Sequence, residues 1–256
     1  MRVFLTGASS GLGHALAIAY AQRHPGLRLG LVARRPEALA ALAAQLPAGA
    51  AVTYALDVND RPALAAAARD FLDRFGAPDA VIANAGINGP TLTGTLGDEL
   101  AFEQILRTNV VAMYDTFAPF VDAMRARRTG RLAGIASVAG VRGFPSLGGY
   151  CASKAAVIGY LESLRLELRG SGVRVVTLAP GYVRTPMTAP NRYPMPFLID
   201  ADVFARRAVA VIDAGRPFAV IPWQMAWVAR ILRVLPPAVF DRAFARAPHK
   251  PRLPAP

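Results

Sequence analysis

The sequence predicts an α/β fold in which a doubly wound, mostly parallel, Rossmann-like sheet of seven strands carries helices on both faces. Three observations predict it. Short apolar runs alternate with longer alanine- and leucine-rich segments, a glycine-rich loop follows the first apolar run, and 54% of the 256 residues are apolar. That apolar fraction is enough to form a core on both sides of a sheet.

Each expected strand is a short run dominated by aliphatic side chains, as buried parallel strands are. The seven runs are Val3–Thr6, Leu29–Ala33, Val52–Leu56, Ala80–Ala83, Arg131–Ala136, Val173–Leu178 and Phe218–Ile221. The segments between them have helical composition, and the clearest are Gly13–Arg23, Pro36–Leu46, Pro62–Phe75, Glu99–Arg127 and Gly149–Arg169. Strand and helix therefore alternate, which favours parallel strands joined by helical crossovers.

No internal repeat or flexible linker divides the chain, so we expect a single dinucleotide-binding and catalytic domain over residues 1–256. The proline-rich stretch that begins at Pro186 is long for a connection, and we expect a substrate lid at about 186–205. A C-terminal helical extension is expected at about 222–247, followed by a tail at 248–256 that carries several prolines.

The chain is strongly basic, with 29 Lys and Arg against 17 Asp and Glu and a formal net charge of +12. Such a charge suits nucleic acid, an anionic membrane surface or an acidic substrate. The arginines are dispersed and no nucleic-acid recognition motif is present. We therefore expect no nucleic-acid partner and favour a general bias toward arginine as the explanation.

The chain has one cysteine, Cys151, which excludes an internal disulfide and indicates a reducing, cytoplasmic location. We interpret Cys151 as a packing residue rather than a reactive thiol. No signal-peptide pattern and no run of about 20 apolar residues occurs, so no membrane-spanning helix is expected. His14, His24 and His249 share no metal-ligand spacing with one another or with Cys151, so we predict no metal site.

A glycine-rich segment, T-G-A-S-S-G-L-G at residues 6–13, stands between the first expected strand and the first helix. Small residues let the backbone approach a pyrophosphate, and a helix N-terminus offers free N–H groups and a partial positive charge. We therefore predict a nucleotide site. The residues expected to form it are Thr6, Gly7, Ser9, Ser10, Gly11, Leu12 and Gly13.

The second strand leads into Arg34 and Arg35, where NAD-selective folds usually place an acidic side chain for the ribose 2′-hydroxyl. A guanidinium instead suits the 2′-phosphate of NADP, and neither of these two positions is acidic. We therefore predict NADP(H) as the cofactor, with Arg34 as the main contact and Arg35 assisting. The alternative is that both arginines merely solvate the start of the next helix.

Tyr150 and Lys154 stand four residues apart in an expected helix, and the chain has one other lysine, Lys250, in the tail. Residues at i and i+4 share a helix face, so we expect the ammonium beside the phenol. A neighbouring cation lowers a tyrosine pKa. The pair could then serve as a general acid and base near neutral pH.

With these motifs the chain resembles the short-chain dehydrogenase/reductase family, of the compact one-domain type, over about residues 1–222. The resemblance depends on motifs in a fixed order. They are T-G-A-S-S-G-L-G at 6–13, Asp57-Val58, Asn84-Ala85-Gly86, Asn109, Ser137, Tyr150-x-x-x-Lys154, and Pro180-Gly181 with Thr185. The chain departs from the family pattern at Ala83, where an asparagine is more usual, and at Ala136, where the family usually has a serine.

Beyond the glycine loop, the resemblance implies cofactor contacts at three further strand ends. They are Asp57 and Val58 at the adenine, Asn84, Ala85 and Gly86 at the adenosine ribose, and Pro180, Gly181, Val183 and Thr185 at the nicotinamide carboxamide.

The resemblance also implies four catalytic residues. Tyr150 would donate a proton to the substrate carbonyl, or remove it in reverse, and Lys154 would lower the tyrosine pKa and bind the nicotinamide ribose. Ser137 would hydrogen-bond the same substrate oxygen, and Asn109 would anchor a water linking Lys154 to solvent. Two donors would thus meet the oxygen where negative charge develops. Taken alone, Ser137 could be an ordinary strand-end serine and Asn109 a residue that caps or breaks its helix.

Three stretches are expected to set substrate specificity, namely Ile87–Leu96, Val138–Gly149 and Pro186–Phe204. The second contains Arg142 and Phe144, near the reacting carbonyl. The third is rich in apolar side chains, which suggests a hydrophobic or acyl-chain substrate. A site for hydride transfer must exclude water in any case, so an apolar lid also fits other substrates.

An apolar stripe marks the C-terminal extension, where Trp223, Trp227, Ile231 and Leu235 recur every four residues. One interpretation is an interfacial helix that rests on an anionic membrane. The other, which we favour, is a helix packed on the domain or on a neighbouring subunit.

The sequence thus predicts an NADPH-dependent oxidoreductase that interconverts a ketone and a secondary alcohol, with reduction favoured. Its partners would be a small-molecule carbonyl or alcohol substrate and, by resemblance, further copies of the chain in a dimer or tetramer. Two other classes are kept open: a catalytically silent nucleotide-sensing or scaffold protein of the same fold, and a nucleic-acid binder that uses the positive charge.

Overall fold

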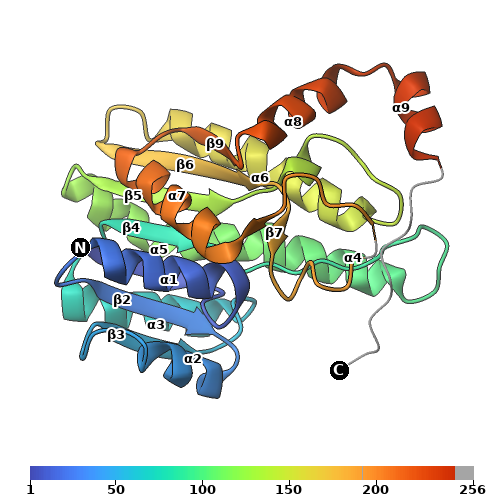
Figure 1. Cartoon of the computed structure of the whole chain (residues 1–256). Helices are drawn as coiled ribbons and strands as arrows, with labels where there is room; N and C mark the ends of the chain where they lie inside the picture. The colour runs from blue at the N-terminus through green and yellow to red at the C-terminus, as the bar shows by residue number, and fades with distance from the viewer. Residues whose placement is uncertain (192, 246–256) are drawn as a thin grey trace.

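The computed structural model describes residues 1–191 and 193–245. At its centre is a sheet of seven strands in which every neighbouring pair is parallel, in the order β3-β2-β1-β4-β5-β6-β9 (Figure 1). The strands are β1 (Arg2–Thr6), β2 (Arg28–Ala33), β3 (Ala51–Ala55), β4 (Ala80–Ala83), β5 (Gly130–Ile135), β6 (Val173–Pro180) and β9 (Phe218–Ile221). This confirms the predicted doubly wound parallel sheet, and each predicted strand lies within two residues of its expected bounds.

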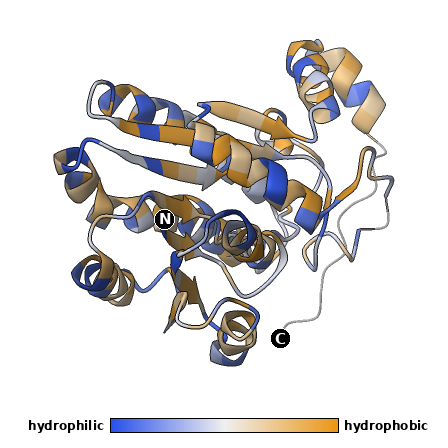
Figure 2. Ribbon diagram, turned by 60° about the vertical axis from the view of Figure 1, so that its left-hand side comes forward, coloured by the Kyte–Doolittle hydropathy of each residue, from blue (hydrophilic) through white to orange (hydrophobic). Residues whose placement is uncertain are grey.

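Helices cover both faces of the sheet. One face carries α1 (Gly11–Arg23), α2 (Pro36–Ala43) and α7 (Ala201–Ala214), and the other carries α3 (Arg61–Phe75), α5 (Ala112–Ala126) and α6 (Gly148–Glu167). Successive strand residues point to opposite faces, so Leu5 of β1 enters the first core and Phe4 the second. Figure 2 shows apolar residues concentrated along the strands and blue residues mainly on the helices and loops.

The predicted helix Glu99–Arg127 is interrupted. After α4 (Asp98–Leu106) the chain makes a π-helical turn, η1 (Arg107–Val111), and then continues as α5. Asn109 lies in this turn with its side chain fully buried against the loop that follows β4. Turns of this kind accommodate one extra residue and are frequent at functional sites.

The predicted lid is a loop closed by two short strands. β7 (Val183–Arg184) pairs with β8 (Ile199–Asp200), and together they enclose residues 185–198. Phe197 within this loop is half-exposed. Phe204, which the sequence interpretation placed in the lid stretch, is instead fully buried on α7, so the loop ends before that helix begins.

The C-terminal extension forms α8 (Gln224–Val234) and α9 (Pro237–Phe244), which extend from the end of β9 away from the sheet (Figure 1). The face of α8 that packs on the protein carries Met225, Ala229 and Leu232. The predicted stripe of Trp223, Trp227 and Ile231 lies on another face and is exposed. α8 therefore packs on the domain, as favoured, but through a face other than the stripe, and packing of the stripe on a neighbouring subunit stays a prediction. Residues 246–256, which include His249 and Lys250, lie outside the described residues.

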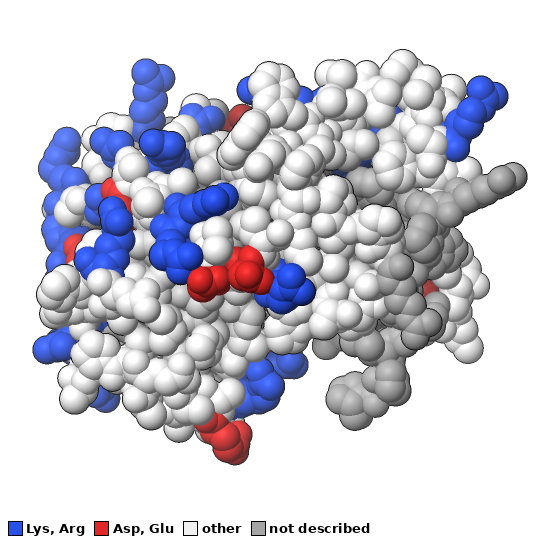
Figure 3. All heavy atoms as spheres, viewed as in Figure 1, with Lys and Arg blue, Asp and Glu red and all other residues white. Residues whose placement is uncertain are grey.

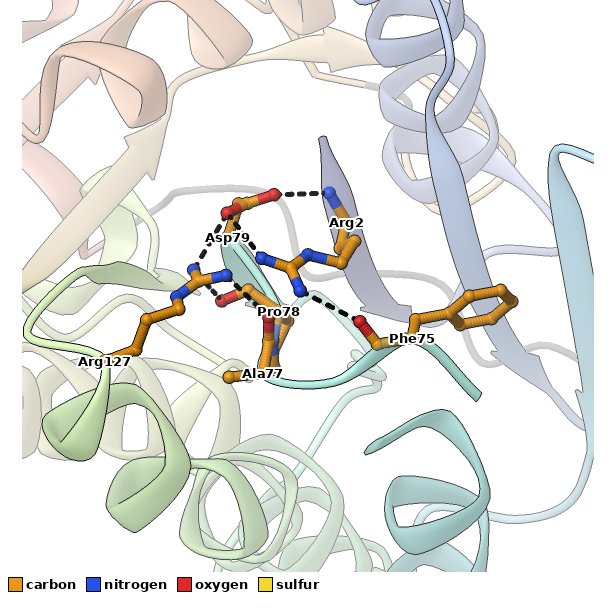
Figure 4. A network of polar contacts seen from close by, with 6 residues as sticks. All are labelled: Arg2, Phe75, Ala77, Pro78, Asp79 and Arg127. Atoms are coloured by element: carbon orange, nitrogen blue, oxygen red, sulfur yellow. Dashed lines mark hydrogen bonds and ion pairs between the residues drawn. The ribbon is translucent and has the colours of Figure 1, made fainter. Parts of the chain in front are cut away.

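A carboxylate joins three elements at the amino-terminal end of the sheet (Figure 4). Asp79, just before β4, accepts hydrogen bonds from the Arg2 backbone N–H at 2.7 Å and from Arg127 Nη2 at 2.8 Å. The Arg2 guanidinium donates to the Phe75 carbonyl at the end of α3, and Arg127 donates to the carbonyls of Ala77 and Pro78. Charged partners make these bonds stronger than neutral ones.

Figure 3 shows basic side chains scattered over this face, most of them toward the amino-terminal end of the sheet. They do not form one continuous groove on the face that is shown, which agrees with the dispersed arginines of the sequence. In the described part of the chain, no helix has both the length and the apolar composition needed to cross a bilayer.

Candidate active site

A cleft opens at the carboxyl ends of the strands, where the chain direction across the sheet reverses between β1 and β4. Ligands of open α/β sheets bind at such a point. The predicted residues that line the cleft are Gly7, Ser9, Ser10, Gly11, Leu12, Arg34, Arg35, Asp57, Val58, Asn84, Ala85, Gly86, Ser137, Tyr150, Lys154, Pro180, Gly181, Val183 and Thr185. Three others, Thr6, Gly13 and Asn109, are buried behind the lining.

The glycine loop packs so closely that two of its positions admit only glycine. Gly7 adopts a φ of +69°, and a Cβ there would lie 2.8 Å from the Ala85 Cα. A Cβ on Gly13 would lie 2.1 Å from the Gly7 carbonyl oxygen, so neither position has room for a side chain. α1 begins at Gly11 with no side-chain cap from Ser10 and no acidic residue in its first turn. The N-terminal N–H groups of α1 therefore fit an anionic group.

Thr6 and Asn84 hold this loop rather than contact a ligand directly. Asn84 Nδ2 donates to the carbonyls of Thr6 and Gly7 at 3.0 and 3.1 Å. The Thr6 hydroxyl accepts from the backbone N–H groups of Asn84 and Ala85. Both amide protons of Asn84 are thus used within the protein, and its side chain fixes the distance between the ends of β1 and β4.

Arg34 and Arg35 line the cleft just after the end of β2, and both are exposed. Arg35 Nη2 reaches the hydroxyl of Ser9 at 3.3 Å and its carbonyl at 3.4 Å, which places this guanidinium against the glycine loop. Arg34 makes no hydrogen bond or ion pair with any described residue. The two cations therefore differ, since Arg35 is already positioned by the loop and Arg34 is not.

Asp57 follows the end of β3 and lines the same cleft as these arginines. Its Oδ1 accepts from the Asn59 backbone N–H at 2.9 Å, and this bond turns the chain after β3 toward the cleft. The adjacent Val58 is buried in the core. The second carboxylate oxygen accepts no hydrogen bond from the described residues, and its contact with an adenine amine stays a prediction.

Ser137, Tyr150 and Lys154 meet at the other end of the cleft. Ser137 follows β5, and the other two lie on the first turns of α6, one turn apart. The Ser137 side chain lies close enough to the Tyr150 hydroxyl to lower the Tyr150 pKa, in opposition to burial. Lys154 Nζ lies over the Tyr150 ring, 5.7 Å from its centroid, and donates to the Ile135 carbonyl at 2.8 Å.

Burial controls the protonation of this pair. It lowers the pKa of Lys154 to about 8, because the ammonium loses its hydration. It also raises the pKa of Tyr150, and the Ser137 side chain opposes that rise only in part. The predicted lowering of the Tyr150 pKa by Lys154 is therefore wrong for the structure described, since the lysine lies over the ring and burial dominates.

Three hydrogen bonds within the protein hold the Asn109 amide, and its role in anchoring a water stays a prediction. Its Oδ1 accepts from the Ile87 N–H at 2.8 Å, and its Nδ2 donates to the Ile87 carbonyl at 3.0 Å and to Ser153 Oγ at 2.9 Å. A Cβ on Gly86 would lie 3.1 Å from Asn109 Oδ1 and 3.7 Å from Lys154 Nζ. The amide therefore fixes the segment beside Lys154, and its oxygen keeps one lone pair for a water.

The loop after β6 closes the cleft from above. The Gly181 N–H donates to the Ile221 carbonyl, and the Thr185 side chain lies over Gly11. Sequence reasoning missed Thr188, whose hydroxyl donates to the Val183 carbonyl at 2.7 Å and accepts from the Thr185 N–H at 3.0 Å. It also missed Ser153. Thr188 acts through local contacts and Ser153 through a bond to Asn109, 44 residues away, and neither contact leaves a spacing signal in the sequence.

Beyond Tyr150 the wall is aromatic and apolar. Tyr182 and Tyr193 are in ring contact, and burial raises the pKa of Tyr193 to about 12, with Tyr182 and Tyr150 close enough to add to the rise. Cys151 is buried beside them, and burial raises the pKa of its thiol. Its thiol is therefore protonated at neutral pH, as a packing residue would be.

No group of three His, Cys, Asp or Glu side chains within residues 1–191 and 193–245 could hold a metal ion. His24, for example, lies 3.0 Å from Asp213 on the far side of α1, in a pair with that carboxylate.

Comparison with known proteins gives consistent results. A family model described as short chain dehydrogenase matches residues 1–195. An uncharacterized oxidoreductase of Myxococcus xanthus is 39% identical over 245 residues, which cover 94% of this chain and 95% of that protein. A 3-oxoacyl-[acyl-carrier-protein] reductase of Thermotoga maritima is 31% identical over 185 residues, or 72% of this chain and 74% of that protein. The X-ray structure of an alcohol dehydrogenase from Thermococcus sibiricus, complexed with 5-hydroxy-NADP, has a TM-score of 0.76 and 25% identity, covering 87% of this chain and 97% of that one.

Proposed function

The chain belongs to the short-chain dehydrogenase family of oxidoreductases, and on that premise we propose that it is an NADPH-dependent reductase that converts a ketone to a secondary alcohol. One observation carries the proposal. Ser137, Tyr150 and the buried Lys154 line one cleft together with a glycine loop and two arginines.

The residues at the cleft would divide the chemistry as follows. A nicotinamide dinucleotide supplies the hydride when bound, with its pyrophosphate at Gly7–Gly13 and its nicotinamide near Pro180 and Thr185. The Tyr150 hydroxyl, kept protonated by its raised pKa, donates a proton to the carbonyl oxygen. Ser137 donates a second hydrogen bond to the same oxygen and orients it.

Lys154 would fix the position of the cofactor ribose relative to the Tyr150 hydroxyl. Its ammonium has three N–H donors, and one of them is used on the Ile135 carbonyl. The other two remain for a ribose hydroxyl and for a water held beside Asn109. That water would return a proton to Tyr150 after each turnover, through Lys154.

The preference for NADP rests on the end of β2. Arg34 and Arg35 lie where a 2′-phosphate would come, and no acidic side chain stands in that part of the cleft lining apart from Asp57. The solved alcohol dehydrogenase with 5-hydroxy-NADP gives independent support from a related fold. NADP pools are usually kept reduced, which supports reduction as the physiological direction.

The substrate class follows from the wall beyond Tyr150. Met187 of the lid loop lines the cleft with Tyr150, and the ring pair Tyr182–Tyr193 lies beside the phenol, which gives the approach an apolar character. Together with the similarity to a 3-oxoacyl reductase, this supports a hydrophobic or acyl-chain ketone. We also propose a cytoplasmic homo-oligomer, with the exposed apolar side chains of Val111, Tyr114 and Leu166 available for self-association.

The test is a panel of lipid, steroid, sugar and β-ketoacyl ketones followed by the absorbance of NADPH. With a verified substrate, Tyr150→Phe should lower kcat by about 10²- to 10⁴-fold, because it removes the general acid and keeps the ring. Undiminished turnover by Tyr150→Phe would refute the assigned chemistry. Binding of NADPH with no turnover across the panel would favour a silent nucleotide-sensing protein instead.

A further inference from the structure

α8 presents an apolar stripe that nothing in the described chain covers. Trp223, Trp227, Ile231 and Val234 are 64%, 58%, 57% and 79% exposed, and the spacing of three or four residues places them along one side of the helix. These include both tryptophans of the protein. Exposure on this scale is unusual for four large apolar residues in one row and marks an interaction surface.

Basic side chains border the stripe. The Arg230 guanidinium lies over the Trp227 ring, 5.2 Å from its centroid. Arg233 follows three residues later, almost one helical turn further along α8. Figure 3 shows mostly uncharged atoms over the region of α8 and α9, at the upper right, with basic side chains at its margin. From residue 222 onward the sequence has one acidic residue, Asp241, and six basic residues. These are Arg230, Arg233, Arg242, Arg246, Lys250 and Arg252.

This charge argues against a second copy as the occupant. A symmetric dimer through the stripe would bring the same patch from each subunit together. Arg230 and Arg233 would then face their own counterparts, which is unfavourable. α8 is also about 16 Å long at 1.5 Å per residue, so one side of it offers less than the roughly 800 Å² that each partner of a stable complex buries.

We propose that α8 is an interfacial helix that docks the protein on an anionic lipid bilayer. The tryptophans and aliphatic side chains would enter the boundary between headgroups and acyl chains. Arg230 and Arg233 would extend to the lipid phosphates, with their stems along the apolar surface. The docking does not depend on catalysis, so it stands or falls separately from the proposed reductase activity.

The tryptophans provide the measurement, because no other tryptophan contributes to the emission. Full-length protein is mixed with vesicles of phosphatidylcholine alone, or of equal parts phosphatidylcholine and phosphatidylglycerol. With the anionic vesicles we expect a blue shift of the emission, quenching by bromine-labelled lipid, and co-flotation that weakens in high salt. With phosphatidylcholine alone we expect little binding.

Two double variants separate the contributions. Ile231→Ser with Val234→Ser keeps both tryptophans and should weaken binding at least about tenfold, because two inserted aliphatic side chains are lost. Arg230→Gln with Arg233→Gln should weaken it by about fivefold for each charge removed. The matched control, Leu96→Ser with Leu100→Ser, changes two exposed apolar residues outside α8, 94% and 66% exposed, and should bind as wild type does.

Three results would overturn the proposal. The first is vesicle binding that the stripe variant and the control lose equally, or that neither loses. The second is equal binding to neutral vesicles. The third is wild-type tryptophan emission that is already shielded from a soluble quencher without lipid, together with a fall in mass by light scattering in the stripe variant. That third result would assign the surface to self-association.

Discussion

At the residue scale, the active-site cleft places a protonated phenol, Tyr150, beside a lysine whose pKa is lowered, Lys154. Burial raises the pKa of Tyr150, so the hydroxyl keeps the proton that a reductase must donate. Burial lowers the pKa of Lys154 to about 8, so its charge varies within an accessible pH range. The lysine is 4% exposed, and its retention in an almost lysine-free chain shows that an arginine does not replace it here. Arginine stays charged when buried, whereas lysine can release its proton.

Lys154 predicts a specific dependence of stability on pH. Its pKa is about 8 in the folded protein, against 10.5 for an ordinary lysine such as it would be in the unfolded chain. Between these pH values the unfolded chain binds more protons than the folded protein. The free energy of unfolding should therefore rise with pH from about 8 toward 10.5, by up to roughly 3 kcal/mol from this group. Urea unfolding at a series of pH values measures it.

The control for that measurement is Lys154→Met, which keeps the length of the side chain and removes the titration. Other groups, such as Cys151 and the tyrosines, titrate equally in both proteins and cancel in the difference. If the difference between the two proteins stays constant from pH 8 to 10, the buried lysine is not the source.

Arg34 and Arg35 predict cofactor preference. Changing either to Ala should raise the KM for NADPH by about 10- to 100-fold, because a charge-assisted bond to phosphate is lost, and Arg34→Ala should leave the KM for NADH nearly unchanged. Arg35→Ala should also loosen the glycine loop through Ser9. Arg207→Ala, an exposed arginine on α7 outside the cleft, is the matched control. An equal rise for both cofactors would show that the arginines do not read the 2′-phosphate.

At the element scale, two departures from regular helix shape the site. The π-helical turn η1 brings Asn109 to Ile87 and Ser153, so one amide connects α5, the loop after β4 and α6. The second departure is the break between α8 and α9, which returns α9 to the loop before α6. Arg142 of that loop donates to the Leu235 carbonyl at 3.0 Å.

α9 predicts an effect on substrate binding from outside the cleft. Phe240 packs against Phe144, and the Arg142 guanidinium lies over its ring at 4.6 Å. Phe240→Ala should free the 138–149 stretch and raise the KM for the ketone by about 3- to 30-fold, as the loss of ~1–2 kcal/mol of ring contacts implies. The KM for NADPH should stay as it is.

Val239→Ala is the matched control for Phe240, because it shortens the neighbouring side chain on the exposed side of the same helix. Steady-state kinetics on both variants distinguish local loosening from general damage to α9. The same KM for the ketone in both would exclude a role of this contact in positioning the substrate stretch.

At the scale of the whole molecule, the sheet could be predicted because buried strands have a recognisable, almost wholly apolar composition. Runs such as Leu29–Ala33 are apolar throughout, as a strand covered on both faces must be. The cleft residues followed from motif order, since strand ends and helix starts meet at one edge. The contacts of Asn109 could not be predicted, because a π turn depends on tertiary bonds and leaves no periodic pattern.

The exposed stripe on α8 was visible in the sequence, but its direction was not. Trp223, Trp227 and Ile231 have the spacing of a buried face, and periodicity does not distinguish a face that packs on the protein from one that meets something else. The parallel face of Met225, Ala229 and Leu232 is less conspicuous because alanine and methionine carry a weaker signal. The pKa of Tyr150 was mispredicted for a related reason, since sequence shows a neighbour but not the depth of burial.

The Asp79 network lies at the end of the sheet opposite the cleft. This network holds β1, α3 and the end of α5 together. None of its residues belongs to a stretch that is expected to contact the substrate. Natural variants, or a laboratory seeking new specificity, can lengthen or exchange those loops while the opposite end keeps the strands in register. Sequence changes in the loops at the carboxyl ends of the strands are therefore tolerated, because the Asp79 network holds the amino-terminal ends in place.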